Sequence, residues 1–115
     1  MQKDVTIYLN DIIFSISLIE RYIEKLSEDE FEESYDDQDK VMRRLEIIAE
    51  AAKKLPEEIR SRNSHIPWKS IIGLRNIIAH NYDEVNTKEI WQIVKYHLPE
   101  TKKQLEQLQA DLQKK

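Results

Sequence analysis

The sequence predicts an all-α protein, an up-and-down bundle of four to five helices that forms one domain over residues 1–115. Two observations predict it. The chain has one Gly and three Pro among 115 residues, so few positions interrupt a helix. Apolar residues also recur at three- and four-residue steps over long stretches, which is the spacing of one helical face. A chain this short builds a modest core, so we expect a second copy to enlarge it in a homodimer.

The first helix is expected from Val5 to Leu26. Its apolar stripe contains Tyr8, Ile12, Ile16, Ile19, Ile23 and Leu26, and it is widened by Leu9, Ile13 and Phe14. This stripe is wide, and the last helix is longer than a small bundle needs; both features favour a homodimer.

The second helix is expected from Asp39 to Leu55, with a stripe of Val41, Leu45, Ile48, Ala52 and Leu55. Before it, Ser27 and Glu30 are typical of a capping box for a short acidic turn that forms the connection. After it, Pro56 cannot continue a helix interior, but it suits the first turn of a short helix in "PEEIRSR".

The third helix begins in "HIPWKSIIGLRNIIAH", with Pro67 near its start and Ile71, Leu74 and Ile78 facing inward. Gly73 is the single glycine and stands in mid-helix, where it costs roughly 1 kcal/mol relative to Ala. Such a residue indicates a close approach to the backbone by another helix or by a ligand.

A long last helix is expected after Asn86, which with Glu89 forms another cap signal. Its apolar face contains Ile90, Ile93, Val94, His97 and Leu98, followed by Leu105, Leu108 and Leu112. Pro99 is expected to kink it.

Composition excludes several classes of protein. The absence of Cys excludes a disulfide scaffold and a thiolate metal site, and it fits a reducing cytosol. No apolar run is long enough to span a bilayer, and the N-terminus lacks the order of a signal peptide. With 35% charged and 40% apolar residues, the chain has the balance of a folded protein, and we expect it in the cytoplasm.

The charge is distributed unevenly. A net charge of −4 argues against a generic nucleic-acid binder. Residues 27–39 carry eight acids and no Lys or Arg, whereas residues 59–82 carry four Lys or Arg, two His and no acid. The second stretch could attract a polyanion. The acidic stretch is read as an ordinary solvated face.

The stretch "LRNIIAHNYDEV", residues 74–85, is the candidate site. Asn76 and His80 are four residues apart and share a helical face. Arg75 and His80 are separated by roughly 140° on an ideal helix, so they converge only if the long arginine reaches the helix end. Tyr82 follows in the turn.

These residue types suit phosphoryl transfer without a metal. An imidazole can move a proton to or from a ribose hydroxyl, an arginine fork can hold phosphate oxygens, and an amide can orient either group. Together they suffice for attack of an RNA 2′-hydroxyl on the adjacent phosphate, a nucleophile that DNA lacks. Because cleavage needs both a base and an acid, two copies of His80 across a dimer cleft would serve it better than one.

A purely structural interpretation stays open. His80 can be a cation that favourably meets the dipole at a helix C-terminus, and Arg75 can pair with Glu46 or Glu50 on a neighbouring helix. Glu50 lies near an apolar stripe and would need such a partner.

The remaining candidates are read as structural. His65 is expected to cap or pack a helix start, and His97 to lie in the core or an interface. Three separated histidines without organised carboxylates predict no metal site. Trp68 and Trp91 are expected to anchor the core.

The chain resembles the HepT-like group of the HEPN superfamily, whose signature is an Arg followed several residues later by a His. The resemblance rests on "YLNDIIFSISLIERYIEKL", "VMRRLEIIAEAAKKLPEEI", "IPWKSIIGLRNIIAHNY" and "EIWQIVKYHLPETKKQLEQL", which cover nearly the whole chain. The tryptophan before the motif and the His-x-Tyr after it make the match specific. The family's usual Gly-Glu-Ala in the central helix reads Ala49-Glu50-Ala51 here.

The resemblance implies a helical homodimer that acts as a metal-independent endoribonuclease toxin with its motif in an interface cleft. It implies that Arg75 and His80 are catalytic and that Asn76 orients. The position of Glu50 near an apolar stripe separately predicts that Glu50 is structural or supports Arg75. A companion MNT-type nucleotidyltransferase antitoxin uses ATP and Mg²⁺ to transfer AMP onto the tyrosine of His-x-Tyr, which is Tyr82 here. The substrate class would be cellular RNA, such as tRNA or mRNA.

A binding module is the rival interpretation. A HEPN-like dimer can bind a nucleotidyltransferase or a nucleotide without cutting RNA. The acidic net charge favours this rival, because a ribonuclease benefits from positive potential. The intact motif favours the enzyme.

Overall fold

The computed structural model describes residues 2–81 and 86–114, and side chains from residue 4 to residue 79 and from residue 86 to residue 114. Every secondary-structure element in these ranges is a helix. In chain order they are α1 (Gln2–Ile23), α2 (Glu28–Glu33), α3 (Tyr35–Lys54), α4 (Glu57–Arg62), α5 (Trp68–Ile72), α6 (Leu74–Asn81), α7 (Thr87–Gln92), the π turn η1 (Ile93–His97) and α8 (Leu98–Gln113). The all-α class predicted from the sequence is confirmed.

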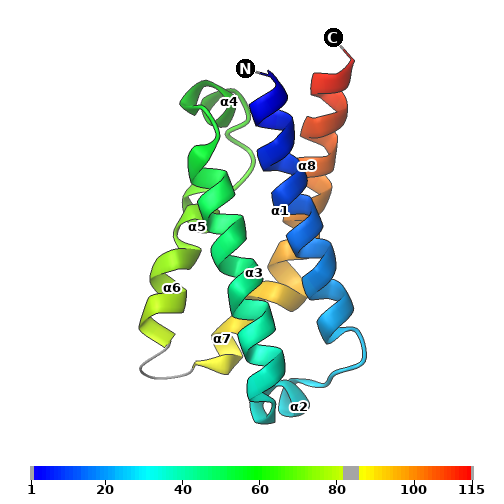
Figure 1. Cartoon of the computed structure of the whole chain (residues 1–115), viewed down its shortest axis with the longest axis vertical. Helices are drawn as coiled ribbons and strands as arrows, with labels where there is room; N and C mark the ends of the chain where they lie inside the picture. Colours follow the sequence, from blue (N-terminus) through cyan, green and yellow to red (C-terminus); the bar gives the residue numbers. More distant parts are fainter. Residues whose placement is uncertain (1, 82–85, 115) are drawn as a thin grey trace.

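Three long helices, α1, α3 and α8, run along the long axis of a molecule that measures 46 × 26 × 21 Å (Figure 1). The α1 helix packs against both α3 and α8, and α3 also packs against α5 and α6. Figure 1 shows α5 and α6 beside α3, on the side away from α1. The helix α6, which carries Arg75, Asn76 and His80, is therefore held by α3.

Residues of one helical face build the core, as the spacing predicts. On α1 they are Val5, Leu9, Ile12, Ile16, Ile19 and Ile23, all at most 5% exposed, and they meet the buried stripe of α3. Phe14 is predicted to widen this stripe, but it is 60% exposed, and Ile7, which lies seven residues before it on the same outer side of α1, is 46% exposed. No helix in the described ranges is long and apolar enough to cross a bilayer.

The connection between α1 and α3 is more ordered than the sequence predicts. The capping box is confirmed: the Glu30 N–H donates to Ser27 Oγ at 3.1 Å, and the Ser27 N–H donates to the Glu30 carboxylate at 2.9 Å. The acidic segment forms α2, and α3 begins at Tyr35 rather than at Asp39. Ser34 causes the earlier start, because its hydroxyl accepts from the Asp37 N–H at 3.2 Å and caps α3.

The last helical segment is interrupted rather than simply kinked. Asn86 caps α7 as predicted, and its side chain accepts from the Glu89 N–H at 3.1 Å. The chain then passes through η1, where the Leu98 N–H donates to the Ile93 carbonyl. Pro99 follows in the first turn of α8, where its missing N–H costs little.

The π turn overturns one expectation about the core. Ile90, Val94 and Leu98 are buried as predicted, whereas His97 is exposed. A π turn contains one residue more than an α turn, so a seven-residue step from Ile90 no longer returns to the same face. His97 is therefore no core residue of this chain.

Both tryptophans anchor the core as predicted, at 7% exposure for Trp68 and 5% for Trp91. The Trp91 ring packs against Phe31, with ring centroids 5.5 Å apart, and so joins α7 to α2. Phe31 is fully buried, but the periodicity of the long helices gives no signal for it, because it lies on a short helix outside them.

Replacement of Phe31 by Ala should lower the free energy of unfolding by about 3–5 kcal/mol, because it leaves a cavity beneath Trp91. Urea denaturation would measure this loss. Tyr35→Ala is the matched control, since Tyr35 is an aromatic residue that is 76% exposed, and its loss should stay within about 0.5 kcal/mol. Equal losses for the two variants would contradict this account of the core.

Candidate functional site

The motif helix α6 is positioned by the residues before it. Pro67 stands at the start of α5, where its carbonyl accepts from the Ile71 N–H at 3.0 Å. Trp68 is buried, and its indole N–H donates to the Asn63 carbonyl at 3.0 Å, which fixes α5 against the end of α4. The direction of α5, and hence the start of α6, follows from these contacts.

The chain breaks its helix at Gly73, between α5 and α6. A Cβ at this position would lie 3.0 Å from the Lys69 carbonyl oxygen and 3.5 Å from that of Ser70. The carbonyls nearest to this position therefore belong to the preceding turn, in α5. The Gly73 carbonyl accepts from the Asn76 N–H at 3.0 Å and starts α6.

The faces of α6 are clearly divided. Leu74 and Ile78 are buried at 4% and 2% exposure, as the sequence predicts, and so is Ile71 of the preceding α5, at 3%. Arg75, Asn76 and Ala79 are exposed on the other side. We call this side the motif face. Since α6 buries its apolar side against α3, the motif face is available to a ligand or a partner.

The predicted site residues are only partly placed. Arg75 and Asn76 share the exposed motif face, and His80 lies in the last turn of α6, one turn after Asn76. That position of His80 fits both a helix-terminus cation and a catalytic base. Tyr82 lies outside the described residues.

Arg75 pairs with neither Glu46 nor Glu50, the two partners that the sequence analysis considered. The salt bridges formed within the described residues are Arg43–Glu46, Arg62–Glu58 and Lys102–Glu20. Glu46 is thus engaged by Arg43 on its own helix, at 3.7 Å. Glu50 is exposed on α3, so water solvates its carboxylate and the argument that it needs a partner fails. The role of Glu50 in supporting Arg75 stays a prediction.

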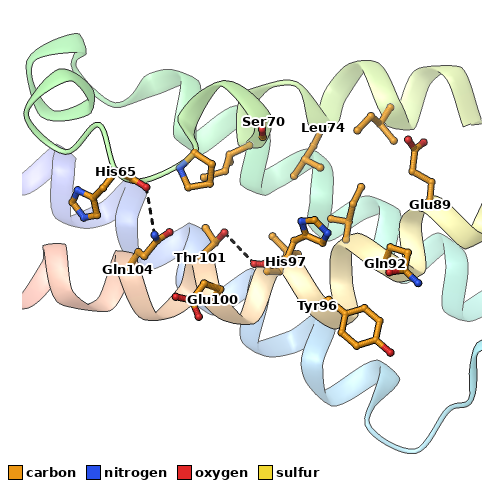
Figure 2. Close-up of a pocket in the computed structure, with 15 residues that line it drawn as sticks. His65, Ser70, Leu74, Glu89, Gln92, Tyr96, His97, Glu100, Thr101 and Gln104 are labelled. Atoms are coloured by element: carbon orange, nitrogen blue, oxygen red, sulfur yellow. Dashed lines mark hydrogen bonds between the residues drawn. The ribbon is translucent and has the colours of Figure 1, made fainter.

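A groove lies next to the motif face and was not predicted from the sequence. It has a volume of about 700 Å³ and runs between α5–α6 on one side and α7, η1 and α8 on the other (Figure 2). Leu74 and Ile77 of α6 line it, whereas Arg75 and Asn76 do not. Tyr96 and His97 of η1 also line it. No sequence pattern predicts the groove, because its two walls come from distant segments and the π turn changes the register of the second wall.

The other histidines are peripheral to the motif. His65 and His97 are both exposed and line the groove, and the His65 carbonyl accepts from the Gln104 side chain at 3.4 Å, which joins the groove's two walls (Figure 2). Within the described residues, no group of three or more His, Cys, Asp or Glu side chains is arranged to hold a metal ion.

Comparison with known proteins identifies the family. A family model described as "Ribonuclease HepT-like" matches residues 12–108. The chain belongs to the HepT-like ribonuclease family. The match begins within α1, ends within α8 and includes the whole of α6.

Several relatives carry ribonuclease names. The chain is 34% identical to a "Putative RNase" of Methanocaldococcus jannaschii, over 99% of this chain and 98% of that one. It is 32% identical to a "Probable ribonuclease HepT" of Thermococcus cleftensis, over 94% and 98%. A third relative, named "Gamma-glutamylcyclotransferase and putative RNase" in M. jannaschii, is 44% identical over 99% of this HepT-like chain, which spans only 51% of that protein. No solved structure matches the chain significantly.

Arg75→Ala should change the free energy of unfolding by less than about 0.5 kcal/mol, because Arg75 is exposed and is absent from the ion pairs formed within the described residues. Lys102→Ala is a control cation that does form a pair, with Glu20 at 2.8 Å, and should cost about 0.5–1 kcal/mol. Thermal and urea unfolding of both variants would measure this. A loss of several kcal/mol for Arg75→Ala would show that Arg75 is structural.

Proposed function

We propose that this chain is a metal-independent endoribonuclease, the toxin of a HEPN/MNT toxin–antitoxin pair, and that it cleaves cellular RNA such as tRNA or mRNA. The observation that carries the proposal is the motif face: Arg75 and Asn76 stand exposed on a helix that otherwise buries its apolar side, and His80 follows one turn later. Membership of the HepT-like ribonuclease family supports it.

The reaction is a transesterification within the RNA. His80 removes the proton of a ribose 2′-hydroxyl, whose oxygen attacks the adjacent phosphorus. Arg75 holds the non-bridging phosphate oxygens in two hydrogen bonds and stabilises the charge that develops on them. Asn76 orients the phosphate or the imidazole. The bond from phosphorus to the 5′-oxygen breaks, that oxygen takes up a proton, and the products are a 2′,3′-cyclic phosphate and a 5′-hydroxyl.

We assign the reaction to a homodimer, because it needs a base and an acid at the same time. Two copies of His80, one from each protomer, would supply both. The apolar side chains of Ile7 and Phe14, which this chain leaves exposed, are consistent with a partner subunit.

An MNT-type nucleotidyltransferase would serve as the antitoxin. With ATP and Mg²⁺ it would transfer AMP onto the hydroxyl of Tyr82 and release pyrophosphate. The added phosphate would be attached two residues after His80 in the sequence. It would compete with RNA for Arg75 and repel the RNA backbone.

The second candidate function is a HEPN-like dimer that binds a nucleotidyltransferase or a nucleotide without catalysis. The net charge of −4 favours it, since a polyanionic substrate is repelled at long range. The exposure of Arg75, within a sequence segment (residues 59–82) that contains no acid, favours the enzyme.

His80→Ala should abolish cleavage of total cellular RNA in EDTA, and Arg75→Gln should reduce it by about 100-fold, since each removes charge or proton transfer from the transition state. The fragments of the unmodified protein should end in 2′,3′-cyclic phosphate. Arg43→Gln is the matched control, because Arg43 is an exposed arginine on α3 and its loss should leave the rate unchanged. Absence of cleavage by unmodified wild-type dimer would favour the binding module.

Incubation with the nucleotidyltransferase, ATP and Mg²⁺ should add AMP to the wild-type chain and not to Tyr82→Phe, as read by intact mass. Tyr35→Phe should be modified like the wild type, because it removes a tyrosine that is 76% exposed but lies outside the motif. The modified wild type should lose its ribonuclease activity. Modification of Tyr82→Phe to the same extent would refute the assignment of this tyrosine.

A further inference from the structure

The short helices α5 and α6 follow each other in the sequence, and each buries its own apolar side. Trp68 and Ile71 of α5 are 7% and 3% exposed, and Leu74 and Ile78 of α6 are 4% and 2% exposed. Both helices pack against α3 (Figure 1). Arg75 stands between these buried residues in the sequence and is exposed. Its exposure therefore depends on how the two helices are joined.

An unbroken helix through this segment would direct Arg75 toward the buried side. Arg75 follows Trp68 by seven residues, so in a continuous α-helix the two side chains would point within about 20° of each other. Ile71, four residues before Arg75, would lie on the same side. Because Trp68 and Ile71 are buried, Arg75 would then face the core, where an unpaired guanidinium is costly. A break between the helices separates the two orientations.

Gly73 makes this break. Its ψ angle is −10°, whereas that of an α-helix is about −42°. Its carbonyl accepts from the Asn76 N–H, three residues later, at 3.0 Å, and from the Ile77 N–H, four residues later, at 3.4 Å. The shorter bond has the spacing of a 3₁₀ turn, which winds more tightly than an α turn. The tight turn rotates α6 relative to α5, so α6 takes the orientation that its own apolar residues require.

The tight turn has no room for a β-carbon. A Cβ on Gly73 would lie 3.0 Å from the Lys69 carbonyl oxygen, which is a backbone atom and already accepts from the Gly73 N–H at 2.9 Å. Alanine is also the strongest helix former, and glycine is one of the weakest. A side chain at this position therefore opposes the break, and alanine in addition favours a continuous helix.

We propose that Gly73 is a positioning residue: it uncouples α6 from α5 and thereby keeps Arg75 on the exposed side of α6, where the arginine can hold a phosphate. The inference rests on the proposed ribonuclease function for the role of Arg75. Trp68 fixes α5 through its burial and through its indole hydrogen bond to the Asn63 carbonyl, at 3.0 Å. In a joined helix α5 would therefore keep its place, and Arg75 would turn toward α3.

Gly73→Ala should keep the helical CD spectrum and lower kcat for RNA cleavage about 100-fold, the loss expected when a catalytic group is misplaced by about 1 Å. Gly73→Ser adds the same Cβ to a weaker helix former, so its loss should be smaller. Ser70→Ala is the matched control. It raises the helix propensity of α5 at an exposed position without adding an atom at the break, so it should keep the wild-type kcat.

A double-mutant cycle distinguishes positioning from a general loss of stability. Arg75→Gln should lower cleavage about 100-fold in the wild-type background but less than about threefold in the Gly73→Ala background, because a misdirected arginine contributes little to the transition state. Equal effects of Arg75→Gln in both backgrounds would show that Gly73 does not act through Arg75, and the proposal would be overturned.

Cysteine labelling measures the same orientation without any cleavage. The chain contains no Cys, so Arg75→Cys supplies a single thiol whose rate of reaction with Ellman's reagent reports its exposure. Addition of Gly73→Ala should slow this reaction about tenfold, because the thiol turns toward α3. The rate for Arg43→Cys, at an exposed position on α3, should not change. An unchanged rate at position 75, or a faster rate with loss of the helical CD spectrum, would overturn the proposal.

The outcomes separate the two proposals. Wild-type protein that fails to cleave RNA, together with slower labelling at position 75 in the presence of Gly73→Ala, would refute the ribonuclease and keep the role of Gly73 in exposing Arg75. Undiminished cleavage by folded Gly73→Ala protein would refute the positioning role and keep the ribonuclease.

Discussion

The packing of α6 against α3 is the interaction on which the proposed chemistry depends. Leu74 and Ile78 are buried at 4% and 2% exposure, and because they lie on one side of a short helix, they fix which residues face outward. Arg75 and Asn76 are exposed for that reason alone. A rotation of α6 by one residue would bury an arginine without a partner, which is costly, so the apolar side of the helix also specifies the orientation of the polar one.

A protein with acidic and basic regions can still bind an RNA substrate if the acidic region lies away from the binding site. The acidic residues gather in α2 and the first turn of α3, whereas residues 59–82, which include α5 and α6, contain no acid. Screening limits the reach of the acidic part to a Debye length of about 8 Å at physiological salt. The net charge of the chain therefore says less about its ligand than the local charge along α6 does.

The irregular parts of the fold adjoin its functional candidates. The break at Gly73 directly precedes the motif helix, and the π turn Ile93–His97 faces it across the groove. Both departures change the register of a helix locally while the apolar residues on either side stay buried. Such an arrangement preserves the core while polar side chains of α6 and η1 stay exposed.

The sequence by itself determined the helical class, the inward faces of the long helices, the Ser27 and Asn86 caps, and the family through the residues around Arg75 and His80. These features depend on local spacing and on hydrogen bonds within a few residues. Only the tertiary structure decided the exposure of Glu50, the position of His97 outside the core and the existence of the groove. These three features depend on how separate segments pack, or on one added residue in a helical turn. A periodic sequence pattern encodes neither the packing nor the added residue.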